Sequence, residues 1–302
     1  MRAVAFASTL SPKPDAAAGP RDLAALRETI ARLERGSGSS GLARKAIGAD
    51  RVTLGGPQNP CRLDVALGGG AARAALHEVV PMQAADSPAA GAFALALAAR
   101  FAATMPGIIL WVVEEFATRE WGAPYGPGLA LQGIDPARLV LVRAADAKDA
   151  LWALEEALKC RSAAVVIGEL WGSARLYDLA ATRRLAEAAR QGGAPGILVH
   201  PSLPAERTAL TSGARGRFGV AARRSLYPAD QVGPTPMPGA QAWGVRLLKV
   251  QAEGGRAVAF DPDRIHDVIW NHQEGVFRDA VSLHLAAGSA HQTGPNLRAR
   301  SA

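Results

Sequence analysis

The apolar positions of the chain form short continuous runs that are separated by segments with helical spacing. Runs of this kind predict strands buried on both faces, and they fall at residues 76–80, 108–113, 139–143, 163–167 and 196–200. Segments with apolar residues three and four positions apart predict helices at about residues 91–101, 146–159 and 176–190. This alternation predicts an α/β fold, with a mostly parallel twisted sheet and helices on both of its faces.

The N-terminal part of the chain has a different pattern. Residues 1–20 are rich in Ala and Pro and predict a disordered tail, whereas Leu23, Leu26, Ile30 and Leu33 predict an amphipathic helix over residues 21–35. A flexible Gly/Ser linker follows at residues 36–41. We therefore divide this part into a tail, a helix with its linker at residues 21–41, and a core that starts at residue 42. A helix on such a linker docks either on its own domain or on another subunit.

Beyond residue 201 the pattern indicates antiparallel strands. We predict a strand at residues 217–222, a long loop at residues 228–238, and a hairpin formed by residues 243–250 and 256–261. An antiparallel edge on a parallel sheet is a common arrangement, so the core is expected to end at residue 262. We expect a C-terminal extension at residues 263–285, with a helix within residues 262–285, and a disordered tail at residues 286–302.

Composition and charge narrow the class of protein. With 302 residues, 49% apolar and 20% charged, the chain can bury a sizeable core and belongs among globular proteins. The formal net charge of +7 has two explanations that both stay open. It indicates either an acidic partner such as nucleic acid, or the arginine-rich composition that a GC-rich genome produces.

The chain shows no pattern typical of a metal site, a disulfide framework or a membrane span. Two cysteines, Cys61 and Cys160, are too few for a disulfide framework or a metal cluster, and they indicate a reducing compartment. His77 and His200 lie in apolar strands and are expected to be core histidines. The most apolar region is interrupted by Arg100 and by a Pro-Gly pair, and the start of the chain is no signal peptide. We therefore expect a cytoplasmic protein without metal or other cofactor.

Residues 76–101 have the order of a phosphate-binding loop: a strand, a loop and a buried helix. The loop, residues 84–91, departs from the GxxxxGK[ST] pattern because it has no Lys and places Asp86 where a phosphate would lie. Ser87 and Gly91 are the remaining loop positions of interest. Backbone N–H groups at a helix start could still bind nucleotide, but the sequence favours a structural loop.

The order of these elements resembles the RecA-like ATPase core, and several phrases are similar to its ImuA branch. The phrases are Leu63-Asp-Val-Ala-Leu-Gly-Gly-Gly70 with Leu76-His-Glu-Val79, Tyr125-Gly-Pro-Gly-Leu129, Ile134-Asp-Pro-Ala-Arg-Leu139, Ala150-Leu-Trp-Ala-Leu-Glu-Glu-Ala157 and Gly168-Glu-Leu170. The resemblance covers residues 23–262 and depends on the order and spacing of the phrases. It implies a cytoplasmic accessory protein of the SOS response. Such a protein acts with ImuB, an inactive relative of Y-family polymerases, and with a DnaE-type polymerase in damage-induced mutagenesis and translesion synthesis.

The resemblance also identifies fallback positions for catalytic carboxylates. Glu115 follows the strand at residues 108–113, where a RecA-like enzyme keeps the carboxylate that activates water, although Glu114 makes the register ambiguous. Gly168 stands where a phosphate-loop enzyme keeps its Mg²⁺-holding Asp, and Glu169 follows it. Because side chains alternate along a strand, we expect Glu169 to point to the opposite face.

A group of arginines surrounds the strand at residues 217–222, where RecA-like proteins have a DNA-contacting loop. The candidates are Arg207, Arg215, Arg217, Arg223 and Arg224. Arginine next to glycine suits contacts with nucleic-acid phosphates, which need charge and close approach. A solvated basic edge is the alternative interpretation.

Three hypotheses follow. The first is a RecA-like domain that has lost its ATPase and serves as an adaptor, binding an ImuB-like protein, a DnaE-type polymerase directly or indirectly, and RecA or single-stranded DNA. The second is an active ATPase or nucleotide-gated switch with an atypical loop. The third is a RecA-binding regulator whose N-terminal helix occupies a filament subunit interface.

Overall fold

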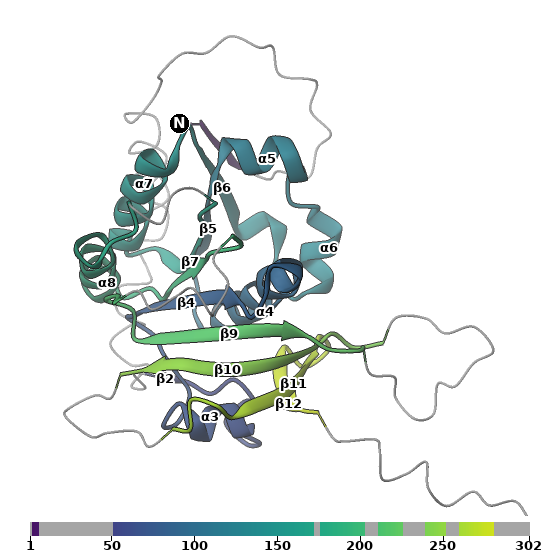
Figure 1. The fold of residues 1–302 in the computed structure, drawn as a ribbon. Helices are drawn as coiled ribbons and strands as arrows, with labels where there is room; N and C mark the ends of the chain where they lie inside the picture. The colour runs from purple at the N-terminus through teal and green to yellow at the C-terminus, as the bar shows by residue number, and fades with distance from the viewer. Residues whose placement is uncertain are drawn as a thin grey trace, which may run out of the picture.

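One large mixed sheet forms the centre of the fold (Figure 1). The computed structural model describes residues 2–5, 51–171, 176–202, 211–225, 239–251 and 260–280. The strands of the large sheet are β1 (Arg2–Ala5), β4 (Leu76–Pro81), β5 (Ile108–Glu114), β6 (Leu139–Ala144), β7 (Ala163–Glu169), β8 (Gly196–Val199), β9 (Gly216–Ala222), β10 (Ala242–Val250), β11 (Ile265–Asn271) and β12 (Val276–Asp279).

Within the described residues the sheet has the strand order β1-β6-β5-β7-β8-β4-β9-β10-β11-β12. The strands from β6 to β9 in this order run parallel to one another. Strand β1 pairs antiparallel with β6 at one edge, and β9 to β12 pair antiparallel at the other. The order reverses direction between β5 and β7, so the carboxyl ends of these strands border a crevice of the kind in which open α/β sheets bind ligands.

Helices cover both faces of the parallel strands (Figure 1). Helix α4 (Ser87–Thr104) packs on one face, and α7 (Ala147–Lys159) and α8 (Leu179–Gly192) pack on the other. The alternation of side chains along each strand supplies both cores: Val165 packs with the α4 core and Val166 with the α7 and α8 core. Helix α4 is apolar nearly all round because it lies between the sheet and other elements.

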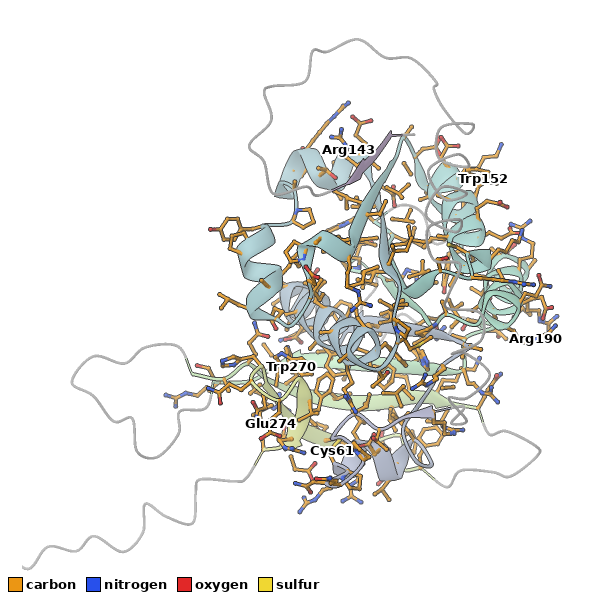
Figure 2. The ribbon with its side chains drawn as sticks, turned by 180° about the vertical axis from the view of Figure 1, so that it is seen from behind. Cys61, Arg143, Trp152, Arg190, Trp270 and Glu274 are labelled. Atoms are coloured by element: carbon orange, nitrogen blue, oxygen red, sulfur yellow. The ribbon has the colours of Figure 1, made fainter. Side chains whose placement is uncertain are left out.

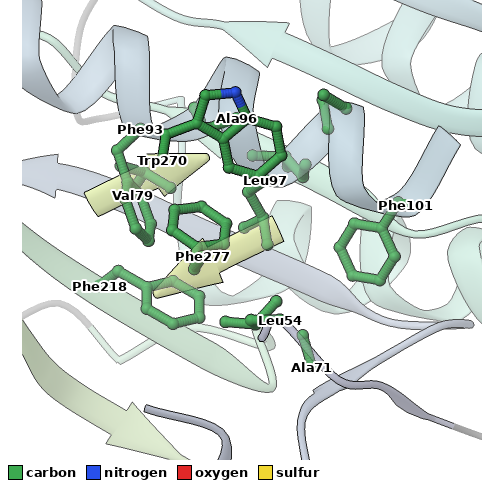
Figure 3. Close-up of a cluster of buried hydrophobic side chains, with 14 of the residues drawn as sticks. Leu54, Ala71, Val79, Phe93, Ala96, Leu97, Phe101, Phe218, Trp270 and Phe277 are labelled. Carbon is green, nitrogen blue, oxygen red and sulfur yellow. The ribbon is translucent and has the colours of Figure 1, made fainter. Parts of the chain in front are cut away.

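An aromatic cluster joins α4 to the antiparallel strands (Figure 3). The ring of Phe93 lies with its centroid 5.7 Å from that of Phe218 in β9, 5.7 Å from Trp243 in β10 and 5.3 Å from Phe277 in β12. Trp270 of β11 contacts Phe277 edge-on at 5.0 Å. Such aromatic pairs add to the stabilisation that burial gives, so the parallel and antiparallel parts of the sheet share one core.

A small lobe packs against the same core. It contains β2 (Arg51–Val52), β3 (Ala71–Ala72) and α3 (Arg62–Ala66). The buried Asp64 carboxylate accepts hydrogen bonds from the backbone N–H groups of Leu54, Gly55 and Cys61. Gly70 has φ 111°, and a Cβ there would lie 2.3 Å from the carbonyl oxygen of Val52, so this turn requires glycine.

The predicted fold class is confirmed: the sheet is mostly parallel, has helices on both faces and ends in antiparallel strands. The five predicted central strands are β4 to β8, and the predicted helices are α4, α7 and α8. Asp146 caps α7 by accepting a hydrogen bond from the Asp149 N–H, and Gly193 ends α8 in the left-handed conformation. The predicted helix at residues 21–35, the linker, the loop at residues 228–238 and the tail at residues 286–302 lie outside the described residues.

Several boundaries differ from the prediction. Helix α4 starts at Ser87 rather than near residue 91, because proline is tolerated in the first helical turn and Pro88 occupies it. The short helices α5 (Glu115–Trp121) and α6 (Gly126–Leu131) were not predicted, since each is too short to show a helical period. Residues Arg2–Ala5 form a strand, in a stretch for which we expected a disordered tail.

The C-terminal hairpin also differs. The strand that follows β10 in the chain and pairs with it is β11, at Ile265–Asn271. The helix that we expected within residues 262–285 is wrong, because β11 and β12 lie in this stretch. Along β11 the residues His266, Val268 and Trp270 are buried and alternate with more exposed ones. That period of two is the signature of a strand with one buried face. The expected second strand of the hairpin was residues 256–261, and residues 252–259 lie outside the described ranges.

Candidate functional site

A cavity of about 760 Å³ opens where β5, β7 and β8 end and α4 begins. Its walls are almost entirely apolar. The described lining residues are Ala84, Ala85, Ser87, Pro88, Gly91, Ala92, Ala94, Leu95, Trp111, Ile167, Glu169, Trp171, Val199 and Pro201. This is the place at which a phosphate-binding loop would hold a nucleotide.

The loop in front of α4 is arranged differently from the expectation. Residues Ala84–Asp86 form the 3₁₀ turn η2, and the Asp86 side chain is buried. Its carboxylate accepts hydrogen bonds from the backbone N–H groups of Gln83 at 3.3 Å and Ala222 at 2.9 Å. Asp86 thus points toward β9 and fastens the loop there, instead of standing where a phosphate would lie.

The cavity lacks a cation among its described lining residues. Ser87 and Gly91 do line it, and a Cβ added at Gly91 would meet nothing within 4 Å, so the space beside the helix is open. Among the lining residues that the structure describes, Glu169 is the ionisable one. A triphosphate placed here would meet a carboxylate and no lysine or arginine from the described residues.

Glu169 faces the cavity, contrary to the expectation from strand alternation. Its Oε1 accepts a hydrogen bond from the indole Nε1 of Trp171 at 2.8 Å, and Glu114 Oε1 accepts one from the Trp171 backbone N–H at 2.7 Å. Burial raises the pKa of Glu169 above its ordinary value, the Trp171 hydrogen bond lowers it, and the nearby charge of Glu114 raises it. Glu169 therefore places a carboxylate on the cavity wall, and Glu114, which is not among the described lining residues, lies close enough to influence the pKa of Glu169.

Gly168 faces the other side of the sheet. A Cβ there would lie 2.7 Å from the Cδ2 atoms of both Leu154 and Leu198. Side chains do alternate along β7, but Glu169 faces the cavity and the Gly168 position faces the α7 core, which is the reverse of our expectation. The position that we aligned with the Mg²⁺-holding Asp therefore points away from the cavity. The similarity of Gly168-Glu-Leu170 to the family phrase could not show which side chain faces the cavity.

Glu115 is a surface residue at the start of α5. Its Oε1 lies 3.1 Å from the Arg119 guanidinium, one turn later. Glu114, by contrast, is buried at the end of β5. Neither glutamate is among the described lining residues of the cavity, although Glu114 accepts a hydrogen bond from the backbone N–H of the lining residue Trp171.

The candidate arginines do not form one patch. Arg215 precedes β9 and Arg223 and Arg224 follow it, so they lie at opposite ends of this strand. Arg223 and Arg224 are exposed, and Arg223 Nε donates to Asp267 Oδ1 at 2.9 Å. Arg207 lies outside the described residues. Arg217 is buried, so it is not available as a surface contact for phosphates.

Arg217 belongs to a buried polar network that the sequence analysis missed. Its Nε donates to Glu78 Oε2 at 2.5 Å, and the Tyr177 hydroxyl donates to Glu78 Oε1 at 2.7 Å. Burial raises the pKa of Glu78, but the charge of Arg217 and these hydrogen bonds outweigh that effect and hold the pKa below its ordinary value. A glutamate within the apolar run of β4 was the available signal, because a buried charge needs a partner.

His200 lies beside this network, with its ring centroid 4.3 Å from that of Tyr177. Burial and the charge of Arg217 lower its pKa from 6.5 to about 4, although the charge of Glu78 raises it. The unfolded chain therefore binds a proton at a higher pH than the folded chain, and stability is lost as pH falls from about 6.5 toward about 4.

We expect this histidine to reduce the free energy of unfolding by about 2 kcal/mol between about pH 7 and about pH 5. Denaturant unfolding of the wild type and of His200→Phe at both pH values measures the effect. The variant should lose about that part of the pH dependence. An unchanged pH dependence would show that His200 titrates normally in the folded protein.

The described residues hold neither a metal cluster nor a reactive thiol. No group of three His, Cys, Asp or Glu side chains in this part of the chain is placed to bind a metal. Cys61 and Cys160 are buried and unbridged. Burial, with the neighbouring Asp64 charge, raises the pKa of the Cys61 thiol to about 12. Figure 2 shows Cys61 in the small lobe, at the end of the molecule that holds the antiparallel strands. In the same ranges no helix combines the length and apolar content needed to cross a membrane.

Comparison with known proteins identifies relatives. No protein-family model matches the chain. The chain is 30% identical over 197 residues to Protein ImuA of Caulobacter vibrioides strain NA1000 / CB15N, which covers 63% of this chain and 74% of the relative. Protein ImuA of strain ATCC 19089 / CIP 103742 / CB 15 gives the same values. The crystal structure of the RadB recombinase superposes with a TM-score of 0.44 at 15% identity, over 72% of this chain and 96% of RadB.

Proposed function

The chain belongs to the ImuA family, and from this premise we propose that it is a non-catalytic, RecA-like accessory protein of damage-induced mutagenesis and translesion synthesis. In this proposal it works as an adaptor in the SOS response and binds other macromolecules instead of turning over ATP. The observation that supports the proposal most is the apolar cavity at the place of a nucleotide site, with Glu169 as its ionisable lining residue among those described.

Three features of this site support the loss of ATPase activity. The loop residues Ala84–Asp86 supply no lysine, and the Asp86 carboxylate is used to bind the backbone of β9. The side chain position at Gly168 faces Leu154 and Leu198, which leaves no room for a metal-binding carboxylate. Each missing part would weaken phosphate or Mg²⁺ binding independently.

The proposed partners come from the family. They are an ImuB-like relative of Y-family polymerases, a DnaE-type polymerase that is bound directly or through the ImuB-like protein, and RecA. The proposed location is the cytoplasm, which is where these partners act on DNA.

Direct binding of single-stranded DNA is a further part of the proposal. Exposed Arg223 and Arg224, together with Arg215 at the other end of β9, are the described candidates for phosphate contacts. Contacts that depend on charge alone weaken steeply with salt, so this binding should be weak and salt-sensitive. Arg207 remains a candidate that lies outside the described residues.

A working ATPase or nucleotide-gated switch is the alternative function. The observation that favours it is Glu169, which faces the cavity and could orient a water molecule, with backbone N–H groups of α4 nearby. A RecA-binding regulator that acts through the helix at residues 21–35 is a third possibility for the same family.

We expect no saturable binding of ATP with Mg²⁺ at micromolar concentration, and no turnover above background. The reason is that the cavity offers a carboxylate and apolar walls to a highly charged ligand. Isothermal titration calorimetry and a phosphate-release assay measure the two quantities, with a functional phosphate-loop ATPase as the positive control. Saturable micromolar binding of ATP, or turnover that disappears in Glu169→Gln, would favour the alternative function instead.

Genetic complementation tests the adaptor role itself. In a host strain that lacks this gene, the wild-type chain should restore mutagenesis after DNA damage. Failure of the wild-type chain to restore mutagenesis would refute the proposed function.

A further inference from the structure

A second hollow adjoins the cavity beside α4. This smaller hollow, of about 160 Å³, lies between β5, the end of β7 and α5. Trp111 and Glu169 line both hollows, so the two meet at these side chains. Together they form one groove across the ends of β5, β7 and β8, which we call the strand-end groove.

The strand-end groove is apolar in both parts. Its larger part is bordered by the indoles of Trp111 and Trp171, and its smaller part by Val113, Ala117 and Pro124. The neighbouring helices α5 and α6 expose large apolar side chains: Phe116 is 55% exposed, Tyr125 73% and Leu131 72%. Apolar surface that extends beyond one closed pocket is typical of a site for another protein.

The charge of the strand-end groove favours a ligand that carries a positive charge. Glu169 lies at the junction of the two hollows, and Glu114 is close enough to influence its charge. No Lys or Arg side chain is present among the described lining residues of either hollow. The site therefore repels anions and is complementary to a cation placed between two apolar groups.

We propose that the strand-end groove binds a segment of a partner protein in which two large apolar side chains flank a lysine or arginine. The larger hollow, with its two indoles, takes the bulkier side chain, and the smaller hollow takes the second. The basic side chain between them reaches Glu169 and stacks on an indole face. The inference rests on the proposed adaptor function, and it identifies the surface and the peptide chemistry that the adaptor would use.

Selection from random short peptides displayed on phage tests this inference without a known partner. The immobilised wild-type protein should enrich peptides with an aromatic or large aliphatic residue on each side of a Lys or Arg. Fluorescein-labelled copies should bind with an affinity that falls at least about tenfold in Ala85→Arg, which places a cation in the larger hollow. Ala85 is exposed at the rim, so this change leaves the core intact.

Two further variants complete the test. Ala180→Arg is the matched control, because Ala180 is exposed on α8 at the other face of the sheet. It should bind the peptides as the wild type does. Glu169→Gln should weaken peptides with the central basic residue about tenfold, and should leave copies with a neutral residue there unchanged. Thermal unfolding of each variant checks that it is folded.

The outcomes separate the groove from the proposed function. Enriched peptides that lack the pattern, or that bind Ala85→Arg and Ala180→Arg equally, would overturn the inference. The absence of enriched peptides would also overturn it. In that case, saturable binding of indole in isothermal titration calorimetry would assign the groove to a small ligand. A wild-type chain that selects such peptides but fails to restore mutagenesis would refute the adaptor function and leave the groove assignment standing.

Discussion

Replacing Arg217 by alanine is expected to lower the free energy of unfolding by about 3–5 kcal/mol. The Arg217 and Glu78 side chains are 7% and 1% exposed, and the arginine Nε lies 2.5 Å from the carboxylate. Without the guanidinium, the Glu78 carboxylate still accepts the hydrogen bond from the Tyr177 hydroxyl, but it stays buried and loses the charge of Arg217 that compensates its own. The cost comes from this unpaired charge more than from the lost attraction. Urea unfolding followed by tryptophan fluorescence measures it.

The double variant Glu78→Gln, Arg217→Met is the control for this interpretation. It removes both charges and keeps an acceptor for the Tyr177 hydroxyl, so it should be clearly more stable than Arg217→Ala alone. Arg224→Ala, at an exposed position beyond β9, should change stability by less than about 0.5 kcal/mol. A near-neutral Arg217→Ala would mean that the ion pair does not exist in solution, and Arg217 would return to the DNA-binding candidates.

Introducing aspartate at Gly168 is expected to cost at least about 3 kcal/mol, a large part of the roughly 5–15 kcal/mol by which domains are usually stable. The substitution restores the residue type that a phosphate-loop enzyme uses for Mg²⁺. In this chain, however, the new side chain would point at Leu154 and Leu198, whose Cδ2 atoms lie 2.7 Å from the Cβ position. It would both overfill the α7 core and bury a charge without a partner.

Gly168→Ala separates the two contributions. Alanine adds only the steric part, which the flexible ends of two leucines can partly relieve, so its cost should be about 1–3 kcal/mol. The difference between the two variants then reports the whole carboxylate group, that is, its buried charge together with its additional volume. Thermal unfolding of both variants in the presence and absence of Mg²⁺ measures it, and a Gly168→Asp protein that Mg²⁺ stabilises would show that our placement of this side chain is wrong.

The sequence predicted the parts of the fold that have a strong period. The strands β4 to β8 are buried on both faces and read as continuous apolar runs, and α7 and α8 each have a cap that the sequence displays. Short elements were missed for the opposite reason. The helices α5 and α6 have seven and six residues, and β11 carries its signal as alternation, within a region that we expected to be a helix.

The candidate site was predicted less completely, because it depends on which way individual side chains point. The absence of a phosphate-binding lysine was readable from residues 84–91. The directions of Asp86, Gly168 and Glu169 were not, since each depends on the register of a strand end or on a distant backbone N–H group. The partner of Arg217 lies 139 residues away along the chain, which no local pattern can reveal.

Helix α4 has one end at the strand-end groove and its middle in the aromatic cluster around Phe93. A ligand that holds the first turn of this helix in place therefore acts on the same cooperative unit as β9, β10 and β12. Because such a ligand binds only the folded state, it raises the free energy of unfolding of the whole unit, including strands that it does not contact. With the proposed partner segment bound in the groove, the unbound protein would be the less stable form, and degradation of unbound copies would be a passive way to match the abundance of the two proteins.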